Sequence, residues 1–106
     1  MGRRRTRCYD GGIGMKEIRT MGEALAKDLM RIWKANKLPL EQLEEDAELA
    51  RISMEGSDAE FEHLIKNGAS MEEIKRAELL STYNHLSYEG YSIALKWLLE
   101  EGYDGR

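Results

Sequence analysis

Two short stretches of this sequence recur 34 residues further along the chain. ISMEG at 52–56 returns as LSYEG at 86–90, and LIKNG at 64–68 returns as LLEEG at 98–102. A period of this length is typical of stacked helical hairpins, in which each unit buries its apolar face against the next one. Such stacked units usually form binding surfaces. The spacing therefore predicts an architecture built from related helical hairpins.

The amino-acid composition favours helices over strands. The chain has 106 residues, which suits one domain, and it contains no valine and a single proline, Pro39. Strong helix formers predominate, so a sheet has little to build from. No apolar run approaches the ~20 residues that a membrane-spanning helix needs. We therefore expect a single all-α domain over residues 15–106 that does not enter a membrane.

Apolar residues spaced by three and four positions predict about five helices. The five segments run over about 15–36, 39–56, 58–68, 71–86 and 91–102. The second and third segments would form one hairpin and the fourth and fifth the next, with sharp turns at Gly56 and Gly90. The patterns Ser57–Glu60 and Ser70–Glu73 have the Ser-x-x-Glu form in which two side chains cap the start of a new helix.

One of these units resembles the ankyrin repeat. Residues 90–102, GYSIALKWLLEEG, look like that family's second helix, with glycines twelve apart and a Leu-Leu pair before the second glycine, and residues 56–68 have the same frame. The family's Thr-Pro-Leu-His is replaced by STYN at 81–84, and residues 69–80 have the pattern of a capped helix where the family has a β-turn finger. The resemblance implies a protein-binding role. Generic helical hairpins with glycine stops are the alternative reading.

The net charge is divided unequally along the chain. Residues 1–14 carry Arg3, Arg4, Arg5 and Arg7 against one acid and sum to +3, which leaves −7 for residues 15–106. Several glycines surround those arginines, and the segment has no apolar period, so we expect a flexible basic arm. Such an arm could follow a phosphate backbone or enter a minor groove. A nucleic-acid-associated regulator that uses these four arginines is therefore the alternative functional hypothesis.

The acidic body indicates a different partner. Glu44, Glu45 and Glu48 lie off the apolar stripe of their helix and face outward, where they could dock a basic protein or simply keep the surface solvated. Tyr88 and Trp97 are of the residue types that dominate binding hot spots when they are exposed. The main hypothesis is a small interaction module, such as an adaptor or inhibitor, that binds a protein partner through these five residues.

The sequence offers little support for catalysis, a metal or a cofactor. Glu60 and His63 form one Glu-x-x-His pattern, whereas di-iron helical bundles need two such patterns and two more glutamates. Cys8 lies in the glycine-rich arm, where nothing would hold a base against it. As a single cysteine it also cannot form an internal disulfide, which favours a cytoplasmic location. We expect no catalytic residue, no metal site and no cofactor.

Overall fold

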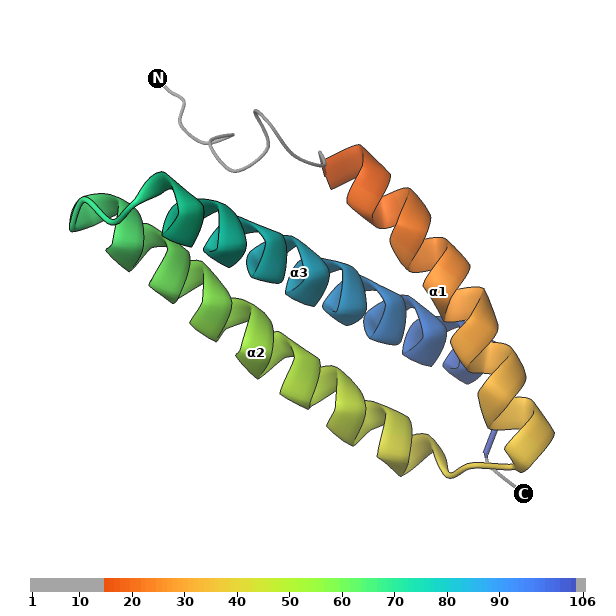
Figure 1. Cartoon of the computed structure of the whole chain (residues 1–106). Helices are drawn as coiled ribbons and strands as arrows, with labels where there is room; N and C mark the ends of the chain where they lie inside the picture. Colours follow the sequence, from red (N-terminus) through yellow and green to blue (C-terminus); the bar gives the residue numbers. More distant parts are fainter. Residues whose placement is uncertain (1–14, 105–106) are drawn as a thin grey trace.

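The computed structural model describes residues 15–104 of the chain. Within that range it contains three α-helices and no strand: α1 (Met15–Asn36), α2 (Leu40–Lys66) and α3 (Met71–Glu100) (Figure 1). The prediction of an all-α fold is confirmed. The prediction of about five helices is wrong, because the second and third segments are one helix, α2, and the fourth and fifth are another, α3.

Two glycines predicted as turns lie inside helices. Gly56 is in the interior of α2 and Gly90 in the interior of α3, so the two predicted hairpins do not form. A glycine inside a helix costs only about 0.5 to 1 kcal/mol relative to alanine, which is less than the flanking turns gain by packing. Ser57 likewise does not cap a helix, because its hydroxyl donates to the Met54 carbonyl oxygen at 3.0 Å from within α2.

The predicted cap at the start of α3 is confirmed. The Ser70 hydroxyl accepts the Glu73 backbone N–H, and the Glu73 carboxylate accepts the Ser70 backbone N–H, both at 3.2 Å. These reciprocal bonds satisfy two N–H groups that have no partner inside the helix. At the start of α2, Pro39 is the residue before the first helical position, Leu40, so this helix begins one residue later than predicted.

All three helices end with the same backbone hydrogen bonds. A residue with positive φ follows each helix: Lys37 (52°), Gly68 (68°) and Gly102 (79°). The next amide then donates to the carbonyl oxygen five residues back, at 3.0 Å after α1 and α2 and 2.9 Å after α3. This is the Schellman motif. The recurrence of 64–68 at 98–102 thus coincides with two helix ends of the same geometry.

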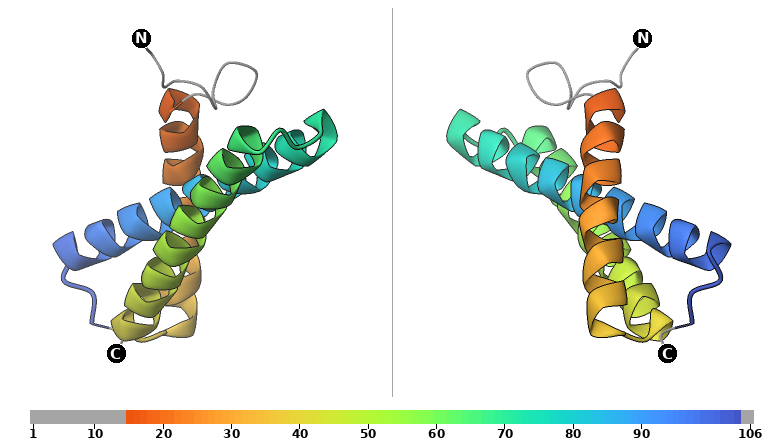
Figure 2. Two further views of the ribbon diagram at one scale, coloured as in Figure 1. Left: turned by 90° about the vertical axis from the view of Figure 1, so that its left-hand side faces the viewer. Right: turned by 90° about the vertical axis from the view of Figure 1, so that its right-hand side faces the viewer.

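The helix α3 is the element on which both other helices pack. It lies between α1 and α2 in Figure 1, and it pairs with α2 as a long antiparallel hairpin. Figure 2 shows that α1 crosses α3 steeply, while the end of α2 and the start of α3 extend together away from α1. The molecule is elongated, with principal extents of 51 × 21 × 21 Å.

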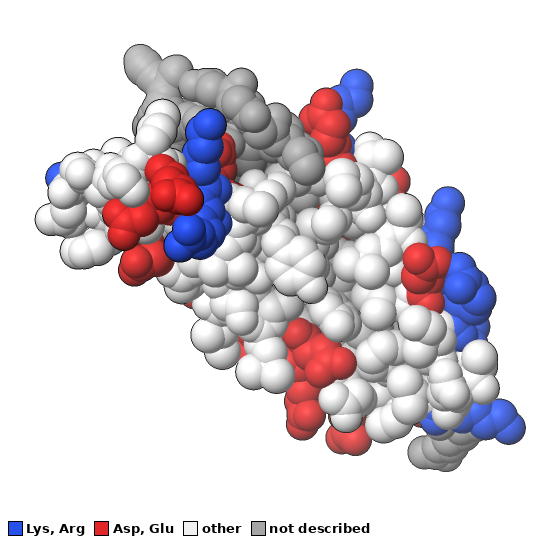
Figure 3. All heavy atoms as spheres, in the orientation of Figure 1, with Lys and Arg blue, Asp and Glu red and all other residues white. Residues whose placement is uncertain are grey.

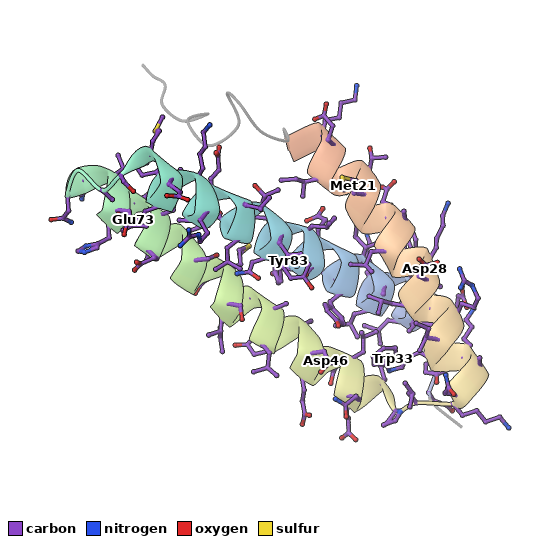
Figure 4. The ribbon with its side chains drawn as sticks, viewed as in Figure 1. Met21, Asp28, Trp33, Asp46, Glu73 and Tyr83 are labelled. Carbon is purple, nitrogen blue, oxygen red and sulfur yellow. The ribbon has the colours of Figure 1, made fainter. Side chains whose placement is uncertain are left out.

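The main core lies where all three helices meet. We call it the three-helix junction, and its buried side chains are Ala26, Leu29 and Trp33 of α1, Leu43 of α2, and Ala94 and Leu98 of α3. Figure 4 labels Trp33 at this end of the molecule, and its indole N–H donates to the Pro39 carbonyl oxygen at 3.0 Å. The Tyr103 hydroxyl donates to the Trp33 carbonyl oxygen at 2.9 Å, so the end of the chain closes the junction.

Glycines allow α1 and α3 to approach closely at their crossing. A Cβ on Gly90 would lie 2.4 Å from Cδ2 of Leu25, and a Cβ on Gly22 would lie 2.6 Å from Cγ of Glu89. Both distances are far below ordinary carbon contacts. Arg19 pairs with Glu89 across the same crossing at 3.5 Å. The role of Gly90 in the fold is therefore close helix packing rather than a turn.

Candidate functional site

The surface of the hairpin is hollowed at the end away from the junction. We call this hollow the distal groove. Its volume is about 660 Å³, and it is lined by Ser57, Glu60 and Leu64 of α2 and by Glu73, Arg76, Ala77, Leu79, Leu80 and Tyr83 of α3. Among the described residues α1 contributes nothing to its walls. In Figure 4, Glu73 marks the tip of the hairpin and Tyr83 lies near the middle of α3.

Large apolar side chains stand exposed in the distal groove. Leu79, Leu80 and Tyr83 are 72%, 54% and 63% exposed, whereas Leu98 on the same helix is fully buried. Leu80, Tyr83, Tyr91, Ala94 and Leu98 follow one another at helical spacing and share one face of α3. That face is covered at the junction and uncovered at the distal groove.

The charged groups around the distal groove make few and weak ion pairs. Arg76 has one ion pair, with Glu72 at 3.9 Å, and the two side chains are 74% and 85% exposed. Such an exposed pair contributes little to stability. Glu60 is exposed on the opposite wall, and the Glu73 carboxylate takes part in the cap of α3. Arg76 is therefore a long cationic side chain that can turn toward a neighbour in the groove.

A polar cluster joins α2 to α3 in the same half of the hairpin. The Asp58 carboxylate accepts hydrogen bonds from the Ser81 hydroxyl and from Nε2 of His85, the latter at 2.8 Å. Ser81 is buried, and the His85 side chain is only 20% exposed. The hydrogen bond of the Ser81 hydroxyl goes to the Asp58 carboxylate, which therefore bridges Ser81 and His85. The cluster fixes the register of the two helices.

The predicted acidic residues lie on the exposed side of α2. Glu41, Glu44, Glu45 and Glu48 line a shallow hollow of about 420 Å³, and Figure 3 shows acidic side chains gathered over this part of α2. Glu44 and Glu45 make no ion pair with any residue between 15 and 104. Glu48 is different, since the Arg51 guanidinium donates to it at 3.1 Å and lowers the pKa of its carboxyl group.

The predicted aromatic residues lie on α3, whereas the predicted acids lie on α2. Tyr88 and Trp97 are both on α3 and both are partly buried, and Trp97 packs against the three-helix junction. Sequence reasoning missed the more exposed Tyr83 and its neighbours Leu79 and Leu80. Their helical spacing was the available signal, but spacing alone does not tell whether another helix covers a stripe.

The four arginines Arg3, Arg4, Arg5 and Arg7 and Cys8 lie outside the described residues. Within residues 15–104 no three His, Cys, Asp or Glu side chains gather in a way that would hold a metal ion. His63, from the Glu-x-x-His pattern, contacts the Asn67 side-chain amide at 3.2 Å. None of the three described helices has a stretch that is both long and apolar enough to cross a bilayer.

Comparisons with protein-family models, with curated proteins and with solved structures found no match. A functional proposal for this chain therefore rests on its surface geometry and chemistry.

Proposed function

We propose that this protein is a small non-catalytic protein–protein interaction module whose main docking surface is the distal groove. The observation that carries the proposal is the exposure of Leu79, Leu80 and Tyr83 on a helix face that is buried further along α3. Contiguous exposed apolar surface on a globular protein typically marks an interaction site. Tyrosine and arginine are also the residue types that most often supply binding energy in such sites.

The shape of the groove favours a helical occupant. Two packed helices leave a furrow between them, and the side chains of a third helix fill such a furrow at helical spacing. At the junction α1 covers the hairpin by crossing α3, with Ala26, Leu29 and Trp33 as its buried side chains. A helix from a partner would cover the distal half along Leu64, Leu80 and Tyr83.

The acidic surface of α2 supplies a second element of the proposal. Glu44 and Glu45 have no ion-pair partner among the described residues, and with Glu48 they favour a basic surface on the partner. Exposed charges are screened within about 10 Å at ordinary salt, so they mainly accelerate association. Replacing all three with glutamine should slow association with a bound protein and leave the melting temperature nearly unchanged. Unaltered association kinetics would leave these acids as a solvated surface.

Contact of the arginine arm with nucleic acid stays a prediction from the sequence. It is tested by titrating duplex and single-stranded nucleic acid against the full chain and against a chain without residues 2–14. Salt-sensitive binding that disappears with the arm would support the alternative function, since counterion release makes phosphate contacts strongly dependent on salt.

The distal groove is tested with a matched pair of variants. Leu80 and Leu99 lie on the same helix and are both 54% exposed, but only Leu80 lines the groove. Tagged wild type, Leu80→Lys and Leu99→Lys are used to capture proteins from cells. We expect at least one bound protein, further copies of this chain included, that wild type and Leu99→Lys retain and Leu80→Lys loses. Equal capture by all three would refute the groove as a docking surface.

A further inference from the structure

We infer that the occupant of the distal groove is a second copy of this chain, packed through α3 in antiparallel orientation about a two-fold axis. The inference rests on the proposed function, because it names the partner of the same groove. It predicts that two α2–α3 hairpins together form a four-helix bundle at their distal ends. The two α1 helices would lie outside that bundle, because each diverges from its own distal hairpin (Figure 2).

Six positions on one face of α3 have the same spacing in both directions, and all of them except the partly buried Ser87 are exposed. Side chains on this face occupy positions with successive spacings of four, three, one, three and four: Glu72, Arg76, Leu79, Leu80, Tyr83 and Ser87. An isologous interface requires a surface that is complementary to itself after a two-fold rotation. A two-fold axis between positions 79 and 80 meets this condition for two antiparallel copies of α3.

The pairs that this axis creates are chemically compatible. Leu79 meets Leu80 of the partner subunit, so two apolar contacts lie at the centre. Arg76 meets Tyr83 of the partner subunit, where the guanidinium can stack on the ring, and symmetry repeats this pair. Glu72 meets Ser87 of the partner subunit, whose hydroxyl can donate to the carboxylate. The four residues nearest the axis, Arg76, Leu79, Leu80 and Tyr83, are all exposed in the single chain. The one ion pair of Arg76, with Glu72, is long, so dimerisation would break no strong contact of this side chain.

Charge has two opposing effects at the groove. Each copy brings one Arg76 and two carboxylates, Glu60 and Glu73, so the guanidinium of one copy attracts the carboxylates of the other while the carboxylates of the two copies repel each other. Glu44 and Glu45 lie 15 to 16 residues before Glu60 along α2, or about 24 Å at 1.5 Å per residue. They therefore lie outside the distal groove, farther from its charged side chains than the screening length of about 8 Å at physiological salt.

The size of the face predicts a dimer of modest affinity. Residues 72–87 span about 24 Å of helix, and two helices side by side are about 20 Å wide, so the face measures about 500 Å² in projection. Its accessible area is larger because the side chains protrude, and standard interfaces bury about 800 Å² on each partner. Weak and transient complexes are found among the smaller interfaces, so we expect dissociation in the micromolar range.

The oligomeric state of the full chain tests the inference. Light scattering and sedimentation are recorded from about 1 to 300 μM in the presence of a reductant, which prevents dimers linked through Cys8. We expect the mass to rise from the 12.2 kDa of one chain toward twice that value. Leu80→Lys should remain at the mass of one chain, and Leu99→Lys should behave as wild type. A single-chain mass throughout, or a dimer that Leu80→Lys leaves intact, would overturn the inference.

A crosslinking experiment tests the register and orientation. Arg76→Cys and Tyr83→Cys are each made in a Cys8→Ser background, checked for helix content, and treated with a short thiol-specific crosslinker. The mixture should give far more crosslinked dimer than either variant alone, because only the mixture places two cysteines opposite each other. Preferential linking of Arg76→Cys to itself would mean parallel helices and would contradict the antiparallel pairing.

Different results would refute the docking surface and its occupancy by a second copy. The chain could stay monomeric and bind another protein, with that binding abolished by Leu80→Lys. This result would refute dimerisation and support the interaction module. A chain with no groove-dependent binding of any kind would refute both.

Discussion

The two halves of the α2–α3 hairpin are built from the same pair of helices but differ in what covers them. At the junction, Leu43, Ala94 and Leu98 are fully buried beneath α1, while in the distal half Leu79, Leu80 and Tyr83 remain exposed. Two helices bury only the stripes that face each other, so a third element is needed to cover the furrow between them. α1 covers one half because it crosses α3 instead of running along it (Figure 2).

The largest expected difference in stability is between alanine variants of two leucines on the same face of α3. Leu98→Ala should lower the free energy of unfolding by about 3 kcal/mol, because it leaves a cavity in the junction. Leu80→Ala should cost less than about 1 kcal/mol, because Leu80 is 54% exposed. Urea unfolding at about 1 μM protein, where dimerisation is negligible, measures both. Similar losses for the two variants would contradict the difference in burial.

A second comparison concerns the two glycines that the 34-residue spacing relates. Gly90→Leu should destabilise by about 1 to 3 kcal/mol, because a side chain there collides with Leu25 at the crossing of α1 and α3. At Gly56 an added Cβ meets nothing within 4 Å, so Gly56→Leu should be neutral or slightly stabilising. Thermal melts measure both variants, since a loss of 1 kcal/mol lowers the melting temperature by about 4 to 8 °C in a domain of this size. Equal shifts would mean that the helices do not cross closely at Gly90.

In the distal half, the polar cluster of Asp58, Ser81 and His85 should contribute more to the free energy of unfolding than a surface ion pair does. Asp58→Ala leaves the buried Ser81 hydroxyl and the His85 ring without their acceptor and should cost about 1 to 2 kcal/mol. The control is Asp28→Ala, which removes an exposed pair with Arg31 and should cost less than about 0.5 kcal/mol. Denaturant unfolding of both variants tests the difference. No excess loss for Asp58→Ala would show that the cluster does not hold α2 to α3.

The smallest effect is expected at the end of α1. Lys37 has a φ of 52°, in the left-handed region that glycine occupies at the ends of α2 and α3. Lys37→Gly should therefore raise the free energy of unfolding by about 0.5 to 1 kcal/mol, the left-handed strain of about 1 to 2 kcal/mol less the extra chain entropy of glycine. A decrease in the melting temperature would indicate that the lysine side chain makes a compensating contact.

The sequence predicted those features that depend on neighbouring residues. The bounds of α1, the Ser70 cap and the helix ends at Gly68 and Gly102 all follow from local patterns. The helical interiors at Gly56 and Gly90 could not be predicted this way, because packing against distant residues outweighs the local cost of glycine. The cap predicted at Ser57 failed for the same reason.

The candidate site was less accessible to prediction than the fold. Asp58 and His85 are 27 residues apart, and only the register of the hairpin brings them together. The apolar spacing that includes Leu80 and Tyr83 is visible in the sequence, but their exposure depends on the direction in which α1 crosses α3. The outward position of Glu44 and Glu45 could be predicted, because it follows from helical periodicity alone.

The central claim is that the distal half of the hairpin binds a second copy of this chain and that the junction does not. Amide hydrogen exchange, measured on the full chain at about 1 μM and at about 200 μM, compares both halves in one experiment. We predict that segments 57–64 and 76–83 exchange more slowly at the higher concentration, while segments 26–33 and 94–98 keep the same rates. Unchanged rates in the distal segments, or slowing confined to the junction, would contradict the claim.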